Sequence, residues 1–183
     1  MVKYNYSDVL ETLRTELLYT ETEYSESFIK LLNRKSSRIF ITAAGRSKMI
    51  ANMFAMRLMH CDYSVHVVGE TTTPSISKED TLLVVSGSGE TQQLIAFTEK
   101  AKVIGAKILL VTGNITSTLK NIADHSFLIG PSSRILSNDK NLLPLGSRFE
   151  LASLIFFETM IINIMSKYNI MENELKQHHA NLE

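Results

Sequence analysis

Several residue types are scarce in this chain of 183 residues, and each scarcity excludes a class of protein. The single cysteine, Cys61, excludes an intrachain disulfide and a cysteine-based zinc site, and it favours a reducing, cytoplasmic setting. Only 8 Gly and 3 Pro accompany 44% hydrophobic residues, which excludes collagen-like and disordered chains. The length suits one domain that is large enough to bury its own core.

An excess of charge and long hydrophobic runs are missing as well. Lys and Arg number 19 and balance 19 Asp and Glu, with no basic stripe, so nucleic acid is not expected as a main partner. Charged residues within the first 14 positions argue against a signal peptide. The most apolar stretch, residues 151–165, contains Glu158 and is shorter than the about 20 residues that cross a bilayer. We therefore expect a buried helix there and no membrane partner.

The hydrophobic pattern predicts strands that alternate with helices. Residues 7–32 form one long amphipathic helix in this prediction. Strands are expected at 38–43, 64–68, 81–85, 107–112 and 125–129, and helices at 49–60, 90–104 and 117–122, from 147 to 165 or beyond, and from 171. Because the strands are apolar on both faces, the fold class is α/β, a doubly wound five-stranded parallel sheet flanked by helices. The expected parts of this single domain are an N-terminal helix (1–34), a sheet core (35–130), a loop (131–146) and C-terminal helices (147–183).

Small hydroxyl residues gather where two of the predicted strands end. Ligands of open parallel sheets bind outside the carboxyl ends of the strands. At such a place backbone N–H groups, hydroxyls and the positive end of a helix dipole can hold a phosphate. An ordinary helix cap would explain the same residue types. The residues concerned are Ser86, Gly87, Ser88, Gly89 and Thr91 after one strand and Ser47 after another.

Other phosphate-binding motifs do not fit this loop. It lacks the third glycine of the dinucleotide fingerprint, and the next strand ends in Thr112-Gly113-Asn114 instead of the acidic residue that would hold a ribose. The Lys-Ser or Lys-Thr of a P-loop and the glycine of a nucleophile elbow are both missing. A nicotinamide cofactor is therefore not expected. His60, His66 and His125 show no metal-ligand spacing, so we also expect no metal.

Residues 86–91 (SGSGET), preceded by an apolar strand and by residues 44–47 (AGRS), resemble the sugar isomerase (SIS) domain over nearly the whole chain. A narrower set is similar to the 6-phospho-3-hexuloisomerases: residues 45–47, 54–60, 67–71, 144–146, 149–150 and 179–183. That family interconverts D-arabino-hex-3-ulose 6-phosphate and fructose 6-phosphate in the ribulose monophosphate route of formaldehyde fixation. The resemblance implies a flavodoxin-like three-layer sandwich, a tetramer and functional coupling to a 3-hexulose 6-phosphate synthase.

The resemblance also assigns roles to individual residues. It makes Ser47, Ser86, Ser88 and Thr91 phosphate ligands. Glu150 is the implied catalytic base, and His179 is a second acid–base group that can come from a neighbouring subunit. A carboxylate suffices to move a carbonyl from C3 to C2 through a cis-enediol, so no cofactor is needed. Further substrate-binding candidates are Gly45, Arg46, Gly87, Gly89 and Glu70.

Ordinary alternatives accompany these assignments. Glu150 could merely complement a helix dipole, and His179 could lie in a solvated tail. Arg46 and Glu70 could form ordinary salt bridges. The helical spacing of four methionines indicates either core packing or a subunit interface. The methionines are Met49, Met53, Met56 and Met59. Functional alternatives are another sugar-phosphate isomerase and a non-catalytic sugar-phosphate sensor, which would need no Glu150.

Overall fold

The structure, a computed structural model, describes residues 3–18, 20, 24–32, 37–130 and 142–182. Its centre is a five-stranded sheet in the order β2-β1-β3-β4-β5, with every neighbouring pair parallel. The strands are β1 (Ile39–Ala43), β2 (Val65–Val67), β3 (Thr81–Ser86), β4 (Lys107–Thr112) and β5 (His125–Leu128). The doubly wound parallel sheet predicted from the sequence is confirmed, because β1 and β3 are neighbours from which the chain winds outward in both directions.

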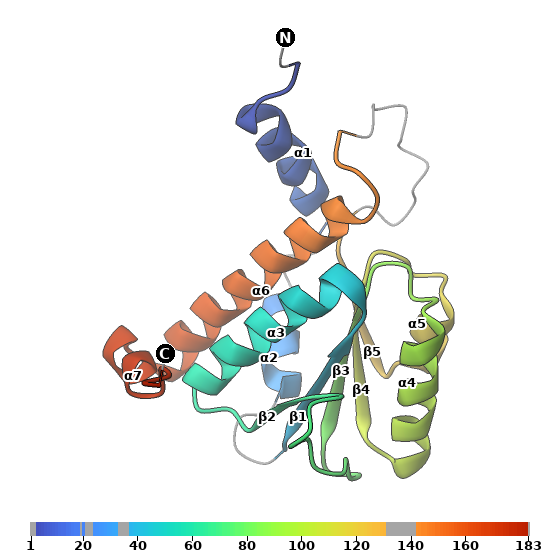
Figure 1. The fold of residues 1–183 in the computed structure, drawn as a ribbon, viewed down its shortest axis with the longest axis vertical. Helices are drawn as coiled ribbons and strands as arrows, with labels where there is room; N and C mark the ends of the chain where they lie inside the picture. The colour runs from blue at the N-terminus through green and yellow to red at the C-terminus, as the bar shows by residue number, and fades with distance from the viewer. Residues whose placement is uncertain (1–2, 19, 21–23, 33–36, 131–141, 183) are drawn as a thin grey trace.

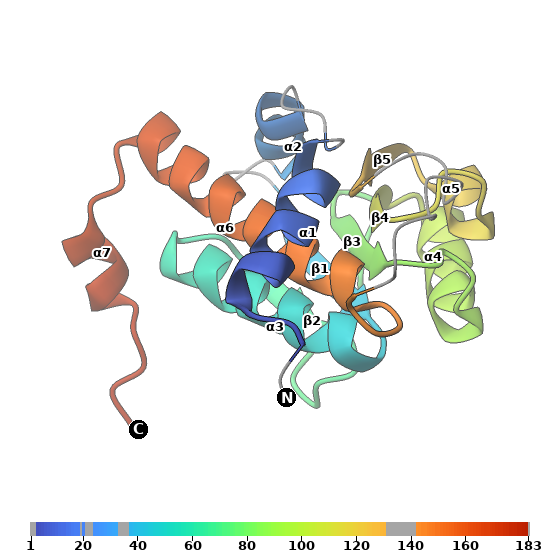
Figure 2. The same ribbon diagram turned by 90° about the horizontal axis from the view of Figure 1, so that it is seen from above.

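Helices cover both faces of the sheet (Figures 1 and 2). One face carries α4 (Gln92–Ile104) and α5 (Thr118–Ile122). The other face carries α2 (Tyr24–Leu32), α3 (Gly45–His60) and α6 (Ser147–Tyr168). α1 (Tyr6–Leu18) packs on α6, and α7 (Glu172–Gln177) follows α6 beside the end of α3. The result is three layers, helix on sheet on helix.

An aromatic cluster joins the helices of the α6 face to the sheet. Phe28 of α2 is fully buried, and its ring lies edge-on to Phe127 of β5 at 4.8 Å and to Phe156 of α6 at 5.4 Å. Phe54 of α3 stacks on Phe157 of α6 at 4.3 Å. Burying such rings contributes on the order of 2–3 kcal/mol each, so this cluster is what holds α6 along the sheet.

The prediction of one helix over residues 7–32 is wrong. α1 ends at Leu18, where the amide of Thr20 donates to the carbonyl of Leu17, and α2 begins at Tyr24. The two helices bury different surfaces: Leu13 of α1 packs toward α6, whereas Phe28 and Leu32 of α2 pack into the main core. One straight helix could not present both sets of side chains to these surfaces.

The last long helix exceeds the predicted length. α6 has 22 residues and is long and apolar enough, by length and composition, to cross a membrane, so the argument from insufficient length is wrong. Its inner face nevertheless packs in the core through residues such as Phe149, Phe157 and Ile164. The prediction of a buried helix is therefore confirmed for this inner face, whereas Ile155 and Ile162 on the outer face are exposed.

The methionines of α3 are on its outer face. Their exposed fractions run from 38% to 69%, so the core-packing alternative is wrong and the subunit interface stays a prediction. The four are Met49, Met53, Met56 and Met59. Of the predicted loop at 131–146, only residues 142–146 are within the described part of the chain.

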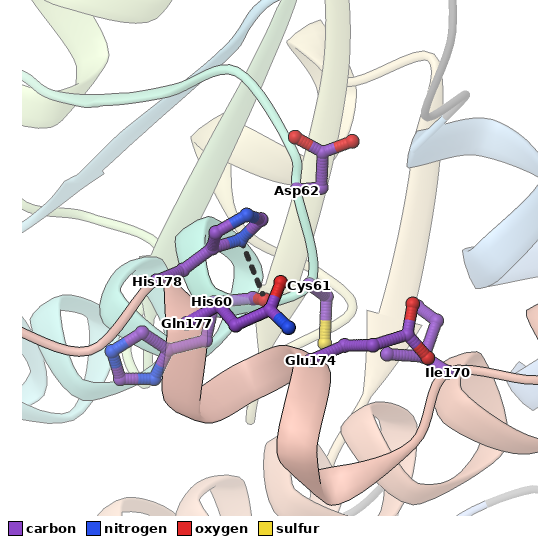
Figure 3. Close-up of a pocket in the computed structure, with 7 residues that line it drawn as sticks. All are labelled: His60, Cys61, Asp62, Ile170, Glu174, Gln177 and His178. Atoms are coloured by element: carbon purple, nitrogen blue, oxygen red, sulfur yellow. Dashed lines mark hydrogen bonds between the residues drawn. The ribbon is translucent and has the colours of Figure 1, made fainter.

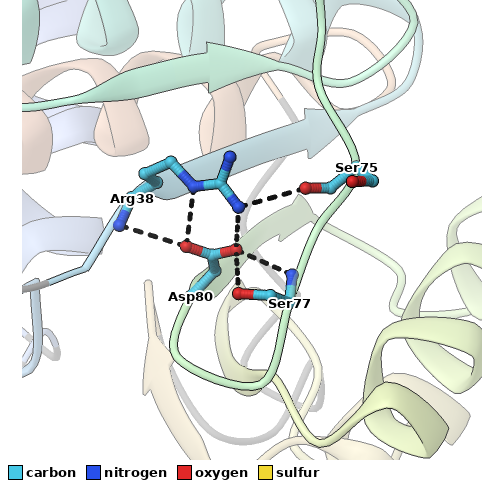
Figure 4. Close-up of polar contacts among 4 residues, drawn as sticks. All are labelled: Arg38, Ser75, Ser77 and Asp80. Atoms are coloured by element: carbon cyan, nitrogen blue, oxygen red, sulfur yellow. Dashed lines mark hydrogen bonds and ion pairs between the residues drawn. The ribbon is translucent and has the colours of Figure 1, made fainter.

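An ion pair between the half-exposed Arg38 and the buried Asp80 ties the amino ends of β1 and β3 together (Figure 4). Asp80 is 3% exposed and accepts hydrogen bonds from Nε and Nη2 of Arg38 (3.0 and 2.7 Å) and from the amide and hydroxyl of Ser77. Burial alone would raise the pKa of Asp80. These hydrogen bonds and the charge of Arg38 outweigh burial and lower the pKa from 3.8 to about 2.

Replacing Asp80 should therefore cost stability in a pH-dependent way. We expect Asp80→Asn to lose about 2 kcal/mol of unfolding free energy at pH 7, because the charged acceptor of Arg38 is gone. Because the pKa of Asp80 is lower in the folded than in the unfolded protein, the ion pair stabilises the fold fully above the unfolded-state pKa. The difference in unfolding free energy between Asp80→Asn and wild type should therefore shrink as the pH falls from 3.8 through about 2. Urea unfolding over this range measures it. Glu79→Gln, an exposed neighbour, is the control, and an equal loss in both variants would contradict the role of the ion pair.

Candidate active site

The predicted phosphate residues meet at the point where the winding of the sheet reverses. Ala43 pairs with Val85 in the β1–β3 register, so the chain leaves both strands at the same edge. Ser47 lies in the first turn of α3, two residues after Gly45, whose φ of +56° lets β1 turn directly into the helix. Ser86 is the last residue of β3, and Ser88 and Thr91 follow it. In sheets of this order, ligands bind at the β1/β3 switch point.

Within the β3–α4 loop the serines shape the backbone. The Oγ of Ser86 accepts from the amide of Gly89 (3.1 Å), and the Oγ of Ser88 accepts from the amide of Glu90 (3.2 Å). Both hydroxyls thus use a lone pair locally and keep their proton for an acceptor such as phosphate. Ser86 is 4% exposed and Ser88 is exposed, so Ser88 is the more accessible of the two. Thr91 is the N-cap residue of α4, and its side chain makes no capping bond.

A second loop, between β4 and α5, braces the first. The carboxylate of Glu90 accepts from the amide and hydroxyl of Thr118 (2.7 and 2.8 Å), which lowers the pKa of Glu90. The side chain of Asn114 donates to the carbonyl of Ser88 (3.0 Å), and the amide of Leu119 donates to the carbonyl of Gly89 (3.1 Å). Sequence analysis missed this brace. The polar run 114–118 after β4 is the signal that could have revealed it.

Phe149 sets the distance between α6 and the phosphate loop. A Cβ atom at Gly87 would lie 2.9 Å from Cδ1 of Phe149, and one at Gly113 would lie 3.3 Å from Cδ2 of the same ring. The two glycines therefore leave the space that the ring fills over the ends of β3 and β4. This packing brings the first turn of α6, with Glu150, to the carboxyl edge of the sheet.

Glu150 forms an ion pair with Arg46. Nε of Arg46 donates to Oε2 of Glu150 at 2.5 Å, joining the first turns of α3 and α6 across 104 residues of sequence. The side chain of Glu150 is 12% exposed, whereas that of Arg46 is 67% exposed. The carboxylate is thus largely covered but reaches the same edge as the phosphate loop. The arginine covers it from the solvent side.

The other substrate candidate, Glu70, is in the turn after the edge strand β2. It is exposed and forms no ion pair with any residue in the described part of the chain. Nearby, Nζ of Lys48 lies 3.8 Å from where a Cβ of Gly69 would be. No pattern in the sequence singles out Lys48, which is a second cation in the first turn of α3.

His179 lies at the opposite end of α6 from Glu150. Helix geometry puts Tyr168 roughly 27 Å beyond Glu150, and α7 and His179 come after it. The ring of His179 stacks on that of His60, the last residue of α3, with centroids 5.3 Å apart. Within one chain the structure does not bring the two predicted catalytic residues together.

A pocket lies at that far end as well (Figure 3). It is lined by His60, Cys61, Asp62, Ile170, Glu174, Gln177 and His178. Nδ1 of His178 is 3.2 Å from the carbonyl oxygen of His60. Ser47 and the phosphate loop are at the other end of α3, so this pocket is separate from the predicted site. Among the residues that the structure describes, no group of three or more His, Cys, Asp or Glu could hold a metal ion.

Another carboxylate approaches the predicted site from α1. Glu16 contacts Gly130, just beyond β5, so closely that a Cβ atom at position 130 would collide with it. Burial raises the pKa of Glu16, and the charge of Arg148, in the first turn of α6, opposes the rise. No pattern in the sequence singles out Glu16.

Comparison with known proteins identifies the fold and its relatives. A model of the SIS domain matches residues 31–140. The 3-hexulose-6-phosphate isomerase of Methylomonas aminofaciens is 34% identical over 97% of this chain and 98% of its own, and that of Bacillus subtilis is 35% identical over 97% and 96%. A crystal structure from Methanococcus jannaschii, from which a function of 3-hexulose-6-phosphate isomerase was inferred, has a TM-score of 0.81 at 34% identity and covers 96% of this chain and 99% of its own.

These matches confirm the resemblance that the motifs predicted. They extend along nearly the full length of both partners, well beyond the SGSGET loop and into the helix that carries Glu150. The chain therefore belongs to the SIS domain family.

Proposed function

We propose that this protein is a 3-hexulose-6-phosphate isomerase, which interconverts D-arabino-hex-3-ulose 6-phosphate and fructose 6-phosphate. The observation that carries the proposal is the position of Glu150, a mostly covered carboxylate at the same sheet edge as a hydroxyl-rich loop. Relatives of that name at 34–35% identity support it. A sensor would need the loop but no base beside it.

The phosphate group is held at the β1/β3 switch point in this proposal. Ser47, Ser88 and Thr91 donate hydroxyl protons to it, and the buried Ser86 both shapes the loop and faces the phosphate from below. The backbone at Gly45, Gly87 and Gly89 approaches the ligand closely because no side chains intervene. The first turn of α4 adds free N–H groups and the positive end of its dipole. Glu70 binds a sugar hydroxyl from the β2 side.

Glu150 is the base of the proposed reaction. It removes the proton from C2, the resulting cis-enediol carries oxygens on C2 and C3, and the proton returns to C3 on the same face. The ketone at C3 and the phosphate on O6 leave the 3-hexulose without a hydroxyl placed to close a five- or six-membered ring, so it arrives open. Fructose 6-phosphate is mostly a furanose, and its reaction also needs ring opening.

His179 serves that ring opening and moves a proton between O2 and O3. Because His179 lies beyond the far end of α6, it acts on the Glu150 of a neighbouring subunit. The exposed methionines of α3 form part of the interface, and the assembly is a tetramer. The protein works in the cytoplasm and receives its substrate from a 3-hexulose 6-phosphate synthase, in the ribulose monophosphate route.

The function is tested by a direct assay. Coupled to a 3-hexulose 6-phosphate synthase, the protein should form fructose 6-phosphate, and in D₂O the product should carry deuterium at C3. Folded protein that forms no product would overturn the proposal. Product formation from arabinose 5-phosphate instead would favour another sugar-phosphate isomerase, and binding without deuterium exchange would favour a sensor.

Glu150→Gln should abolish turnover without loss of binding. The amide is nearly isosteric but cannot accept the C2 proton, so kcat should fall about 10³-fold. Protection against thermal unfolding by glucitol 6-phosphate, which lacks the reacting carbonyl, should persist. Glu158→Gln, two turns further along α6, is the matched control and should keep kcat within about twofold. If Glu150→Gln keeps more than about a tenth of kcat, the base is elsewhere.

Mixed oligomers test whether His179 acts between subunits. Refolding Glu150→Gln chains together with His179→Ala chains should restore activity, because about a quarter of the sites in a random mixture combine both wild-type residues. Mixing either variant with the Glu150→Gln/His179→Ala double variant is the control, since no site then holds both residues. No recovery in demonstrably mixed oligomers would place His179 outside the neighbour's site.

A further inference from the structure

The first turn of α3 has an unusual charge. It holds Arg46 and Lys48 and no acidic residue, although the positive end of a helix dipole disfavours cations. Arg46 gains little from burial, since its side chain is 67% exposed. Helix stability therefore does not explain an arginine at this position.

Glu150 is the one ion-pair partner of Arg46 among the residues that the structure describes. Only Nε of Arg46 is engaged, at 2.5 Å from Oε2 of Glu150, and the two terminal NH₂ groups donate to no other described residue. A guanidinium offers five N–H donors in a planar fork, so Arg46 keeps four for a ligand. Those donors belong to a side chain that is 67% exposed and that is paired with a carboxylate only 12% exposed.

The proposed reaction moves a negative charge away from Glu150. When the carboxylate takes the C2 proton, the C–H electron pair becomes the C2=C3 double bond, and the carbonyl electron pair moves onto O3. Glu150 is then neutral, and the enediolate oxygen carries the charge. A proton then moves from O2 to O3, the O2 electron pair forms the carbonyl at C2, and C3 takes the proton back from Glu150, which regains its negative charge. A cation that stays near both groups would be paired at every stage.

We propose that Arg46 is a catalytic residue, which pairs with Glu150 before the reaction and with O2 and O3 of the enediolate during it. This inference rests on the proposed function. The oxygens of a cis-enediolate are coplanar and on the same side of the double bond, so two parallel N–H groups of a guanidinium can bind them together, as they bind a carboxylate. The positive charge of Arg46 then stabilises the intermediate instead of the helix.

Two variants of the same helical turn test the role. Arg46→Gln should lower kcat about 10²-fold with a small change in KM, because the interaction strengthens as charge develops on the substrate. Lys48→Gln removes the same charge from the same turn but not from Glu150, and it should keep kcat within about threefold. Arg46→Lys should recover only part of the loss, since an ammonium lacks the fork. Equal effects in the Gln variants, or full activity of Arg46→Gln, would overturn the proposal.

A binding measurement separates direct contact from mere positioning of Glu150. The probe is a sugar-phosphate hydroxamate, whose planar O–C–N–O group copies the enediolate, and glucitol 6-phosphate is the reference ligand. In the Glu150→Gln background there is no carboxylate left to position. Adding Arg46→Gln there should still weaken hydroxamate binding at least about tenfold and leave glucitol 6-phosphate within about twofold. Unchanged hydroxamate affinity would reduce Arg46 to a positioning residue and overturn the proposal.

Different results would contradict the proposed isomerase activity and the role of Arg46. If wild-type protein forms no fructose 6-phosphate, the proposed function falls, and the role of Arg46 falls with it. If wild-type protein is active while Arg46→Gln retains its kcat and its hydroxamate affinity, only the role of Arg46 falls.

Discussion

The contact of one aromatic ring with two glycines determines where the candidate site is. Phe149 lies over Gly87 and Gly113, where any side chain would displace it. Because α6 is held along its length by the aromatic cluster around Phe28, a shift at its first turn could not be absorbed by tilting the helix without breaking core contacts. The position of Glu150 relative to the phosphate loop thus depends on side-chain packing in the core, whereas the loop itself is shaped by hydrogen bonds.

Charge at this edge of the sheet is arranged around that packing. Two helices begin there, α3 and α4, and their positive ends face the same region. α3 adds Arg46, while Glu90 accepts hydrogen bonds from Thr118 and Glu150 accepts one from Arg46. The edge therefore favours an anion, and Glu150, which reaches it from α6, forms an ion pair with the guanidinium of Arg46. A phosphate ester and a transient enediolate are both ligands of this kind.

The length of α6 separates the two ends of the molecule. Glu150 is in its first turn, and His178 and His179, which contact His60 of α3, come only after its last. The Arg46–Glu150 pair and the His60–His179 pair lie at opposite ends of α3, so they are roughly 21 Å apart within one chain. Any chemistry that needs both would have to draw them from different subunits, and the exposed methionines of α3 lie along the helix between the two ends.

Local properties were readable from the sequence: the five strands, apolar on both faces, required a parallel sheet, and the glycine- and hydroxyl-rich turns identified the edge where a ligand would bind. The family followed from motifs at those turns. Tertiary structure alone decided that residues 7–32 break into two helices, since each half buries a different surface. It also decided the contacts of Phe149 with Gly87, of Glu90 with Thr118, and of Arg46 with Glu150. Periodicity and turn chemistry act over a few residues, whereas these contacts join segments 28 to 104 residues apart, and only packing of the whole chain brings such partners together.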